Sequence, residues 1–273
     1  MSDVAESTMI TRAADLPADL REYVHDLILV LADTKRLLGM RYAEWILGAP
    51  ELEAGIACAS MSQDEWGHGR LLYALLKDFG DDVDAIEHGR EPSAYRSMQA
   101  LDRAPVSWPE LVALNALADT ALSNQLEALT ASTYVPLRQR VQKILDEEQF
   151  HTAHGRAWFT RLARAGDDTR AELAAAVSRY IPDVLAWFGN ESDAARAFRN
   201  ASIVDAAASD LRARYLQSIA PLLADVGAGD AVTSIEPDWN GFDESTRRYA
   251  GSAPDEETIR RIRGDKNRAF LMD

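Results

Sequence analysis

The chain has 273 residues, 47% of them hydrophobic, and a formal net charge of −15 at neutral pH. This excess of negative charge argues against a general surface for nucleic acid or anionic membranes, because both need clustered positive charge. No apolar run approaches the length of a membrane span, no secretion signal is visible, and the single cysteine, Cys58, rules out an internal disulfide. We therefore expect a cytoplasmic protein that binds neither nucleic acid nor membrane.

Helices are expected along most of the chain. Ala, Leu, Arg and Glu dominate while β-branched residues are sparse, which favours helices. In the first helix, apolar residues recur at helical spacing, as at Leu27, Leu31 and Leu38. The turn at Gly48-Ala49-Pro50, the glycine Gly80 and the capping residue Ser107 predict helix ends. The predicted helices cover residues 18–47, 50–79, 108–132, 136–166, 168–188, 192–224 and 255–268.

The order of these helices predicts an all-α fold. The first four form two similar hairpins, joined by a long crossover over residues 81–107. We expect residues 1–17 to form a flexible N-terminal arm and residues 18–225 to form the helical bundle. Residues 226–273 are richer in Gly, Pro and Asp at their start and are expected to wrap the surface of the same domain.

Two Glu-x-x-His motifs carry the functional signal. Glu65 precedes His68 by three residues, and Glu148 precedes His151 by three. Residues three apart on a helix lie on one face, about 5–6 Å apart at Cβ, so each pair can reach the same metal ion. Two such motifs in long helices are typical of the four-helix di-metal carboxylate bundle, in which each of the other two helices adds one carboxylate.

Hairpin symmetry predicts the carboxylate of the second hairpin. Glu148 lies fifteen residues beyond Thr133 in the turn, and a similar count backwards leads to Asp119. Glu127, the alternative on the same helix, is too near the turn by about 12 Å at 1.5 Å per residue. Glu147 faces about 100° away from Glu148 and is excluded as a ligand. We therefore prefer Asp119.

The first hairpin lacks its carboxylate. Counting back from Pro50 by the distance to Glu65 leads to Lys35, which lies on the inner face of its helix. Asp33 is at nearly the same height but points elsewhere, because it is about 200° around the helix. Three carboxylates cannot neutralise two divalent ions, and a protonated Lys35 would be repelled by them. Two metals beside a neutral Lys35, one metal beside a charged Lys35, and no metal all stay open; a weakened site beside His68 is expected.

These motifs resemble those of a known family. Residues Gln63 to Gly69 are similar to the Gln-Asp-Glu-Ala-Gly-His-Gly motif in the catalytic subunit of bacterial phenylacetyl-CoA epoxidases. Asp119 with Asn124-Gln125, and the run from Glu147 to His151, also resemble that subunit. Two features depart from it: the glutamate of the family's first helix falls on Lys35, and residues 41–45 and 50–53 look more like the non-catalytic structural subunit. The chain thus resembles a catalytic-side paralogue in the family.

The resemblance implies a ferritin-like four-helix bundle with accessory C-terminal helices. It implies a non-haem iron oxygenase component, with one or two iron ions, that uses O2 to oxygenate an aromatic acyl-CoA substrate. Such enzymes need a separate reductase and assemble as homo- or hetero-oligomers. Two alternatives are a non-catalytic structural subunit and a ferritin-like protein that binds or oxidises iron.

The resemblance also assigns roles to the residues. Glu65 and Glu148 would bridge the metals, His68 and His151 would each bind one, and Asp119 would be the terminal carboxylate. The candidate catalytic residues are Lys35, Glu65 and Glu148, with Lys35 able to impair the site.

Overall fold

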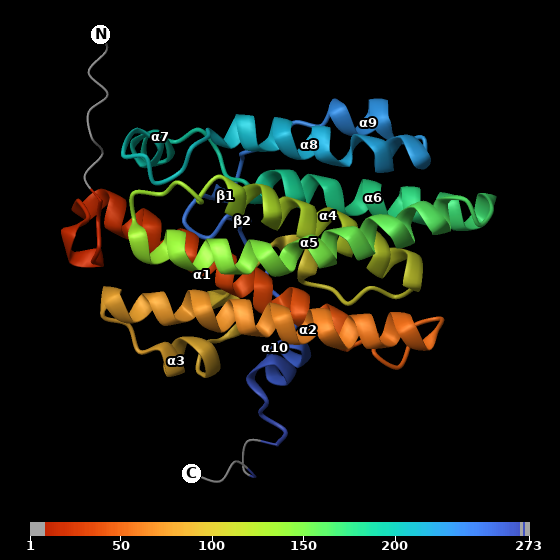
Figure 1. Cartoon of the computed structure of the whole chain (residues 1–273), viewed down its shortest axis with the longest axis horizontal. Coiled ribbons are helices and arrows are strands. Elements are labelled where there is room, and N and C mark those ends of the chain that lie inside the picture. The colour runs from red at the N-terminus through yellow and green to blue at the C-terminus, as the bar shows by residue number, and fades with distance from the viewer. Residues whose placement is uncertain (1–8, 268–269, 271–273) are drawn as a thin grey trace.

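The computed structural model describes residues 9–267 and 270 (Figure 1). Long helices dominate the described chain, and a short antiparallel hairpin pairs Phe242 with Tyr249. The long helices are α1 (Ala18–Ala43), α2 (Leu52–Tyr73), α4 (Trp108–Glu127), α5 (Val135–Ala163), α6 (Asp167–Trp187) and α8 (Ala208–Asp225). The shorter elements are α3 (Val83–His88), α7 (Asp193–Asn200), α9 (Gly229–Thr233), α10 (Glu256–Arg263), strands β1 (Phe242–Asp243) and β2 (Arg248–Tyr249), and 3-10 turns at Ala13–Asp15, Ala74–Phe79, Pro92–Ala94 and Gln99–Leu101.

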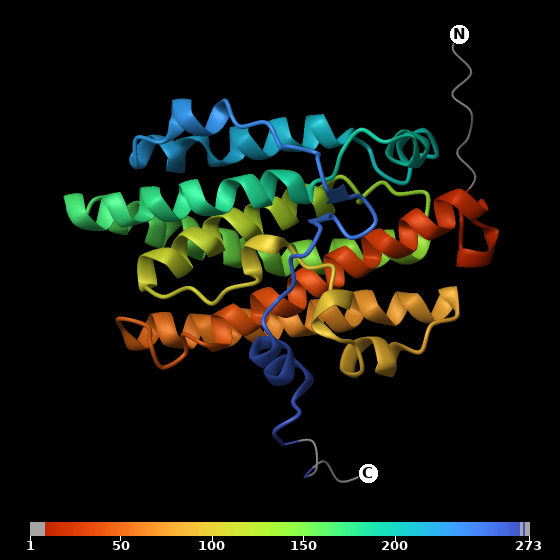
Figure 2. The same cartoon turned by 180° about the vertical axis from the view of Figure 1, so that it is seen from behind.

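Four of these helices form a ferritin-like bundle around one apolar core. Helix α1 packs along α2, and α4 packs along α5, so each hairpin is antiparallel (Figures 1 and 2). The stripe of Leu27, Leu31 and Leu38 is buried between them. Helices α6 and α8 pack against α4 and α5 as an outer layer. The predicted all-α fold with accessory C-terminal helices is therefore confirmed.

Local signals set several helix ends. Ser107 caps α4, since its Oγ accepts a hydrogen bond from the Glu110 amide at 3.3 Å. Gly80 ends the 3-10 turn after α2 in the left-handed conformation, with φ of 95°. Helix α1 ends at Ala43, four residues before the predicted end, because the chain tightens into i+3 bonds ahead of the Gly48-Ala49-Pro50 turn.

The single helix predicted over residues 192–224 is wrong. The structure has two helices there, α7 and α8, separated by residues 201–207. This segment bonds to the α4–α5 turn: the Thr133 amide donates to the Ser202 carbonyl, and the Asp205 amide donates to the Ala128 carbonyl, both at 3.0 Å. Ser202, whose carbonyl makes one of these bonds to the turn, has a positive φ of 55°. Tertiary hydrogen bonds outweigh helical propensity here.

The ends of the chain pack on the bundle where they are described. Of the arm predicted over residues 1–17, residues 1–8 lie outside the described residues, and Ile10 bonds through its backbone to Thr133 and Val135, both at 2.9 Å. After α9, the chain crosses the bundle to α10, which packs on α1 (Figure 2). Arg36 of α1 donates to the Ile262 carbonyl at 3.0 Å and fixes this end. No helix in the described part of the chain is both long and apolar enough to span a membrane.

Candidate metal centre

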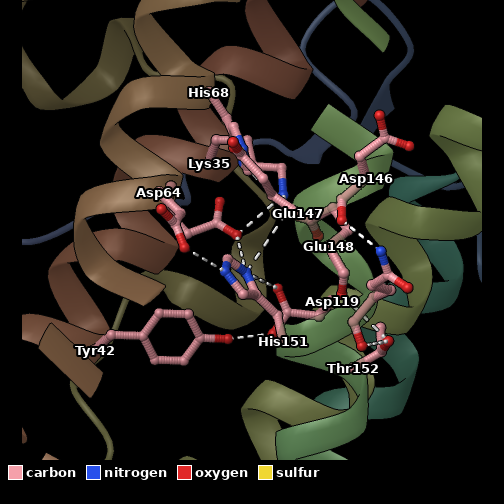
Figure 3. Close-up of polar contacts among 12 residues, drawn as sticks. Lys35, Tyr42, Asp64, His68, Asp119, Asp146, Glu147, Glu148, His151 and Thr152 are labelled. Atoms are coloured by element: carbon pink, nitrogen blue, oxygen red, sulfur yellow. Dashed lines mark hydrogen bonds and ion pairs between the residues drawn. The ribbon is translucent and has the colours of Figure 1, made fainter. Parts of the chain in front are cut away.

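Charged side chains from all four bundle helices meet in the middle of the core (Figure 3). Helix α1 supplies Lys35, α2 supplies Glu65, α4 supplies Asp119, and α5 supplies Glu148 and His151. All five are at most 1% exposed. Ligand atoms of Glu65, Asp119, Glu148 and His151 lie within 4.8 Å of one another. Three carboxylates and an imidazole thus face one small volume.

The donor atoms of this cluster fit a divalent metal ion. Glu65 Oε2, Asp119 Oδ1 and Glu148 Oε2 are buried and have no hydrogen-bond partner among the described residues. Such atoms are costly in a protein core unless a cation or donor binds them. A carboxylate-rich set with one imidazole suits Fe(II), Mn(II) and similar ions. The free oxygens are therefore where a metal would bind.

Lys35 lies between the two Glu-x-x-His glutamates. Its Nζ is 3.0 Å from Glu65 Oε1 and 2.5 Å from Glu148 Oε1. Burial alone would lower the pKa of Lys35, but the charges of Glu148, Glu65 and Asp119 outweigh it and raise that pKa above its usual value. Lys35 is therefore a buried ammonium ion, and it occupies the space between the two carboxylates that would bridge a pair of metals.

The buried environment shifts the pKa values of Glu65 and Glu148 in opposite directions. Burial raises the pKa of Glu65 to about 7, against the opposing charge of Lys35. Burial would also raise the pKa of Glu148, but Lys35, His68 and His151 together lower it below its usual range. The environment therefore favours the ionised form more strongly for Glu148, which also lies at the shorter distance from Lys35.

His151 is held among the carboxylates by its Nδ1 atom. Nδ1 is 3.1 Å from Glu65 Oε1, 3.5 Å from Glu148 Oε1 and 3.9 Å from Asp119 Oδ1. Burial alone would lower the pKa of His151, yet its bonds to Asp119 and Glu65 raise that pKa to about 11. A metal at this position would displace that proton, since imidazole binds metals in its neutral form.

His68 stands on the Lys35 side of the centre. Its Nδ1 is 3.3 Å from Glu148 Oε1, and its ring centre is 6.2 Å from that of His151. It does not belong to the group of four whose ligand atoms are mutually close. Of the five predicted metal ligands, the structure therefore brings four together and leaves His68 beside the ammonium group of Lys35.

An acidic residue orients each histidine from the opposite motif. His151 Nε2 lies 3.2 Å from Asp64 Oδ2, and His68 Nε2 lies 2.6 Å from Glu147 Oε2 (Figure 3). Such a bond fixes the ring and its tautomer, so that Nδ1 faces the interior. Sequence reasoning excluded Glu147 from the ligand positions and assigned no role to it or to Asp64. The signal was present, because an acid directly precedes each motif glutamate.

Tyr42 and Asn115 hold Asp119 from one side, and sequence reasoning missed both roles. The Tyr42 hydroxyl and the Asn115 amide both donate to Asp119 Oδ2, and Asn115 also donates to the Tyr42 hydroxyl at 2.9 Å. This leaves Oδ1 of Asp119 free. Spacing offered a weak signal, since Tyr42 follows Lys35 by two helical turns and Asn115 precedes Asp119 by four residues.

The rejected carboxylates lie away from the centre. Asp33 is buried on the side of α1 away from the cluster, where it accepts a hydrogen bond from Arg90 at 2.9 Å. Glu127 is exposed near the end of α4. No acidic side chain from the described length of α1 replaces Lys35 in the cluster.

A ferritin-like bundle with buried carboxylates and an imidazole on facing helices is the arrangement on which di-metal carboxylate proteins build their metal sites. Comparison with known families refines this class. Residues 2–235 match the family described as phenylacetic acid catabolic protein, so the chain belongs to that family.

Two curated relatives are different subunits of one enzyme, the 1,2-phenylacetyl-CoA epoxidase of Escherichia coli (strain K12). The chain is 26% identical over 209 residues to the first of them, covering 75% of this chain and 66% of that protein. It is 24% identical over 151 residues to the second, covering 55% of this chain and 61% of that protein. The matches thus span less than two thirds of each relative's length. Likeness to two different subunits agrees with the mixed motifs of the sequence.

Proposed function

We propose that the chain is a non-haem iron oxygenase component of the phenylacetyl-CoA epoxidase type, with a single metal ion on the Asp119 and His151 side of its centre. The observation that carries this proposal is the position of Lys35, whose ammonium group contacts Glu65 and Glu148 where a second metal would bind. Glu65, Asp119, Glu148 and His151 would hold the ion.

Charge balance supports one ion rather than two. The formal charges sum to zero for three carboxylates, one ammonium group and one divalent cation. A second divalent ion would leave two uncompensated positive charges in a buried site, where unpaired charge is costly. It would also lie against the ammonium group of Lys35, since both need the same oxygens of Glu65 and Glu148.

The residues around the ion would each have a distinct role. Bound iron would supply the activation of O2 for oxygenation of an aromatic ring. Asp64 would keep Nδ1 of His151 turned inward, and Tyr42 would fix Asp119 through its Oδ2 oxygen. Lys35 would hold Glu65 and Glu148 in place. By analogy with the named relatives, the substrate is an aromatic acyl-CoA, and the partners are other subunits and a reductase.

The test is the metal content of the chain after anaerobic loading with Fe(II). We expect one iron per chain in the parent protein and two in Lys35→Glu, because the variant restores the missing carboxylate and removes the ammonium group. Lys35→Met is the matched control: it removes the charge without adding a ligand, and should not gain a second firmly bound ion. Two irons in the parent protein would contradict the single-ion centre.

A structural, non-catalytic subunit is the second candidate. The observation favouring it is that Lys35 already compensates part of the buried negative charge without any metal. Absence of iron in both the parent chain and Lys35→Glu would support this candidate.

The third candidate is a protein that binds or oxidises iron and has no organic substrate. A thermal-shift comparison of phenylacetyl-CoA with free CoA distinguishes this candidate from the oxygenase, because only an oxygenase should gain thermal stability from the acyl thioester.

A further inference from the structure

A cavity of about 270 Å³ lies between α4 and α5, with Ser218 of α8 on its outer side. Glu148 of the metal centre is part of its wall. Glu148 is itself fully buried, so the cavity ends against this residue and its carboxylate oxygens are covered by the packed core. The cavity therefore lies between the candidate metal centre and the outside of the bundle, and the side chain of Glu148 separates the two.

One wall of the cavity is a row of oxygen-bearing side chains on a single face of α4. Thr120, Ser123, Asn124 and Glu127 all line it, at helical spacings of three and four residues. Residues so spaced lie above one another, roughly 5 Å apart along the axis. Thr120 is 2% exposed whereas Glu127 is exposed, so the row leads from solvent to the residue next to Asp119.

Two buried oxygens without a hydrogen-bond partner in the described chain lie where the cavity approaches the centre. Thr120 Oγ1 and Glu148 Oε2 are buried and lack a hydrogen-bond partner among the described residues. The Asn124 side-chain nitrogen donates to the Thr120 carbonyl at 2.8 Å, which fixes the amide against the helix. Hydroxyl, amide and carboxylate oxygens are the groups that hydrated divalent ions prefer.

The two ends of the cavity carry opposite charge. Arg156 lies eight residues beyond Glu148 on α5, about 12 Å along the helix axis. Since α4 and α5 are antiparallel, Arg156 and Glu127 lie at opposite ends. A cation is attracted at the Glu127 end and repelled at the other. The polar lining and the small volume, below the roughly 300–1,000 Å³ of ligand pockets, do not suit an aromatic acyl group.

We propose that this cavity is the path by which a divalent metal ion reaches the centre, with Glu127 at its mouth and Thr120 beside its inner end. A metal site built from buried ligands needs such a path. The inference rests on the proposed function, since it requires that the centre binds a metal. It assigns to Glu127, which is too far from the centre to be a ligand, a role in metal loading.

The test is the rate at which metal-free chain takes up Mn(II), followed by the loss of the free Mn(II) signal in electron paramagnetic resonance. Glu127→Gln removes the charge at the mouth, and Ser123→Leu narrows the passage without changing charge. We expect each to slow uptake about tenfold, while one ion per chain still binds at equilibrium. Glu53→Gln, which removes an exposed carboxylate from α2, is the matched control and should load at the parent rate.

The outcomes separate the two proposals. If the parent chain binds one Mn(II) but all variants load at its rate, the path is wrong and the ion enters elsewhere. The face with Asp64 and Glu147, whose side chains are 39% and 44% exposed, would then be the next route to block. If the parent chain binds no Mn(II) at equilibrium, the proposed metal centre is wrong, and the proposed path to it is wrong as well. Circular dichroism of each variant checks that it is folded.

Discussion

At the scale of single residues, Lys35 decides what the centre can hold. A buried carboxylate destabilises a fold unless a positive charge or a hydrogen-bond donor compensates it. Lys35 compensates Glu65 and Glu148 at 3.0 Å and 2.5 Å, whereas Asp119 Oδ1 has no hydrogen-bond partner in the described structure and is 3.9 Å from His151 Nδ1. The negative charge that is left over lies on the Asp119 and His151 side, so we expect a metal ion to bind on that side of the centre.

The residues that orient the two histidines test this asymmetry. Asp64→Asn weakens the bond that fixes His151, and should lower affinity for Mn(II) or Fe(II) by about 10–100-fold. Glu147→Gln makes the matched change next to His68 and should leave the affinity nearly unchanged. Isothermal titration of metal-free protein measures both. Equal losses in the two variants would mean that His68 is also a ligand, against the single-ion centre.

At the scale of elements, the distance between α4 and α5 depends on Gly155. A Cβ atom at this position would lie 2.7 Å from Asn115 Oδ1 and 3.1 Å from the Ala116 nitrogen. Both are closer than ordinary van der Waals contact. The glycine therefore lets the two helices approach closely where Asn115 reaches Asp119 and the carbonyl of His151.

Gly155→Ala should consequently destabilise the protein, by about 1–3 kcal/mol, because the added methyl group overpacks the helix contact. It should also weaken metal binding by displacing Asn115. Gly67→Ala on α2 is the control: nothing lies within 4 Å of its Cβ position, so alanine should stabilise the helix by up to about 1 kcal/mol. Urea unfolding measures both changes. A neutral result for Gly155→Ala would show that the helices can separate without cost.

At the scale of the whole molecule, the segment after α9 ties the outer layer to the bundle. It crosses one face of the molecule from the α8 layer to α1 (Figure 2). Arg247 donates to Gln125 at 3.1 Å, and Arg248 donates to the Ser97 carbonyl at 2.5 Å. Arg248 also pairs with Asp102 at 2.5 Å and is 4% exposed. Much of this attachment therefore depends on buried arginines.

Arg248→Met should lower the free energy of unfolding by about 3–5 kcal/mol, because it leaves the carboxylate of Asp102 buried and unpaired. Burial raises the pKa of Asp102, against the opposing charge of Arg248. Protonation therefore relieves the unpaired charge, so the loss should be smaller at pH 5 than at pH 8. Arg260→Met, in an exposed part of α10, is the control. A loss that does not vary with pH would contradict this account of Asp102.

The amino-acid sequence by itself determined what depends on the regular geometry of a helix. A fixed rise and turn per residue predicted that Lys35 lies opposite Glu65 and points inward, and that Asp119 rather than Glu127 lies opposite Glu148. The helices of the bundle followed from apolar spacing and from signals such as Ser107 and Gly80. These inferences need only neighbours along the chain and the symmetry of a hairpin.

Only the tertiary structure decided which side chains meet across helices. It gave the two ion pairs of Lys35, the bond of Asp64 to His151, and the exclusion of His68 from the compact cluster. It also showed two helices where the sequence predicted one over residues 192–224, because residues 201–207 form hydrogen bonds with the α4–α5 turn. These features depend on the rotation and separation of packed helices. No pattern within one helix determines those quantities, since they result from the fit of the whole core.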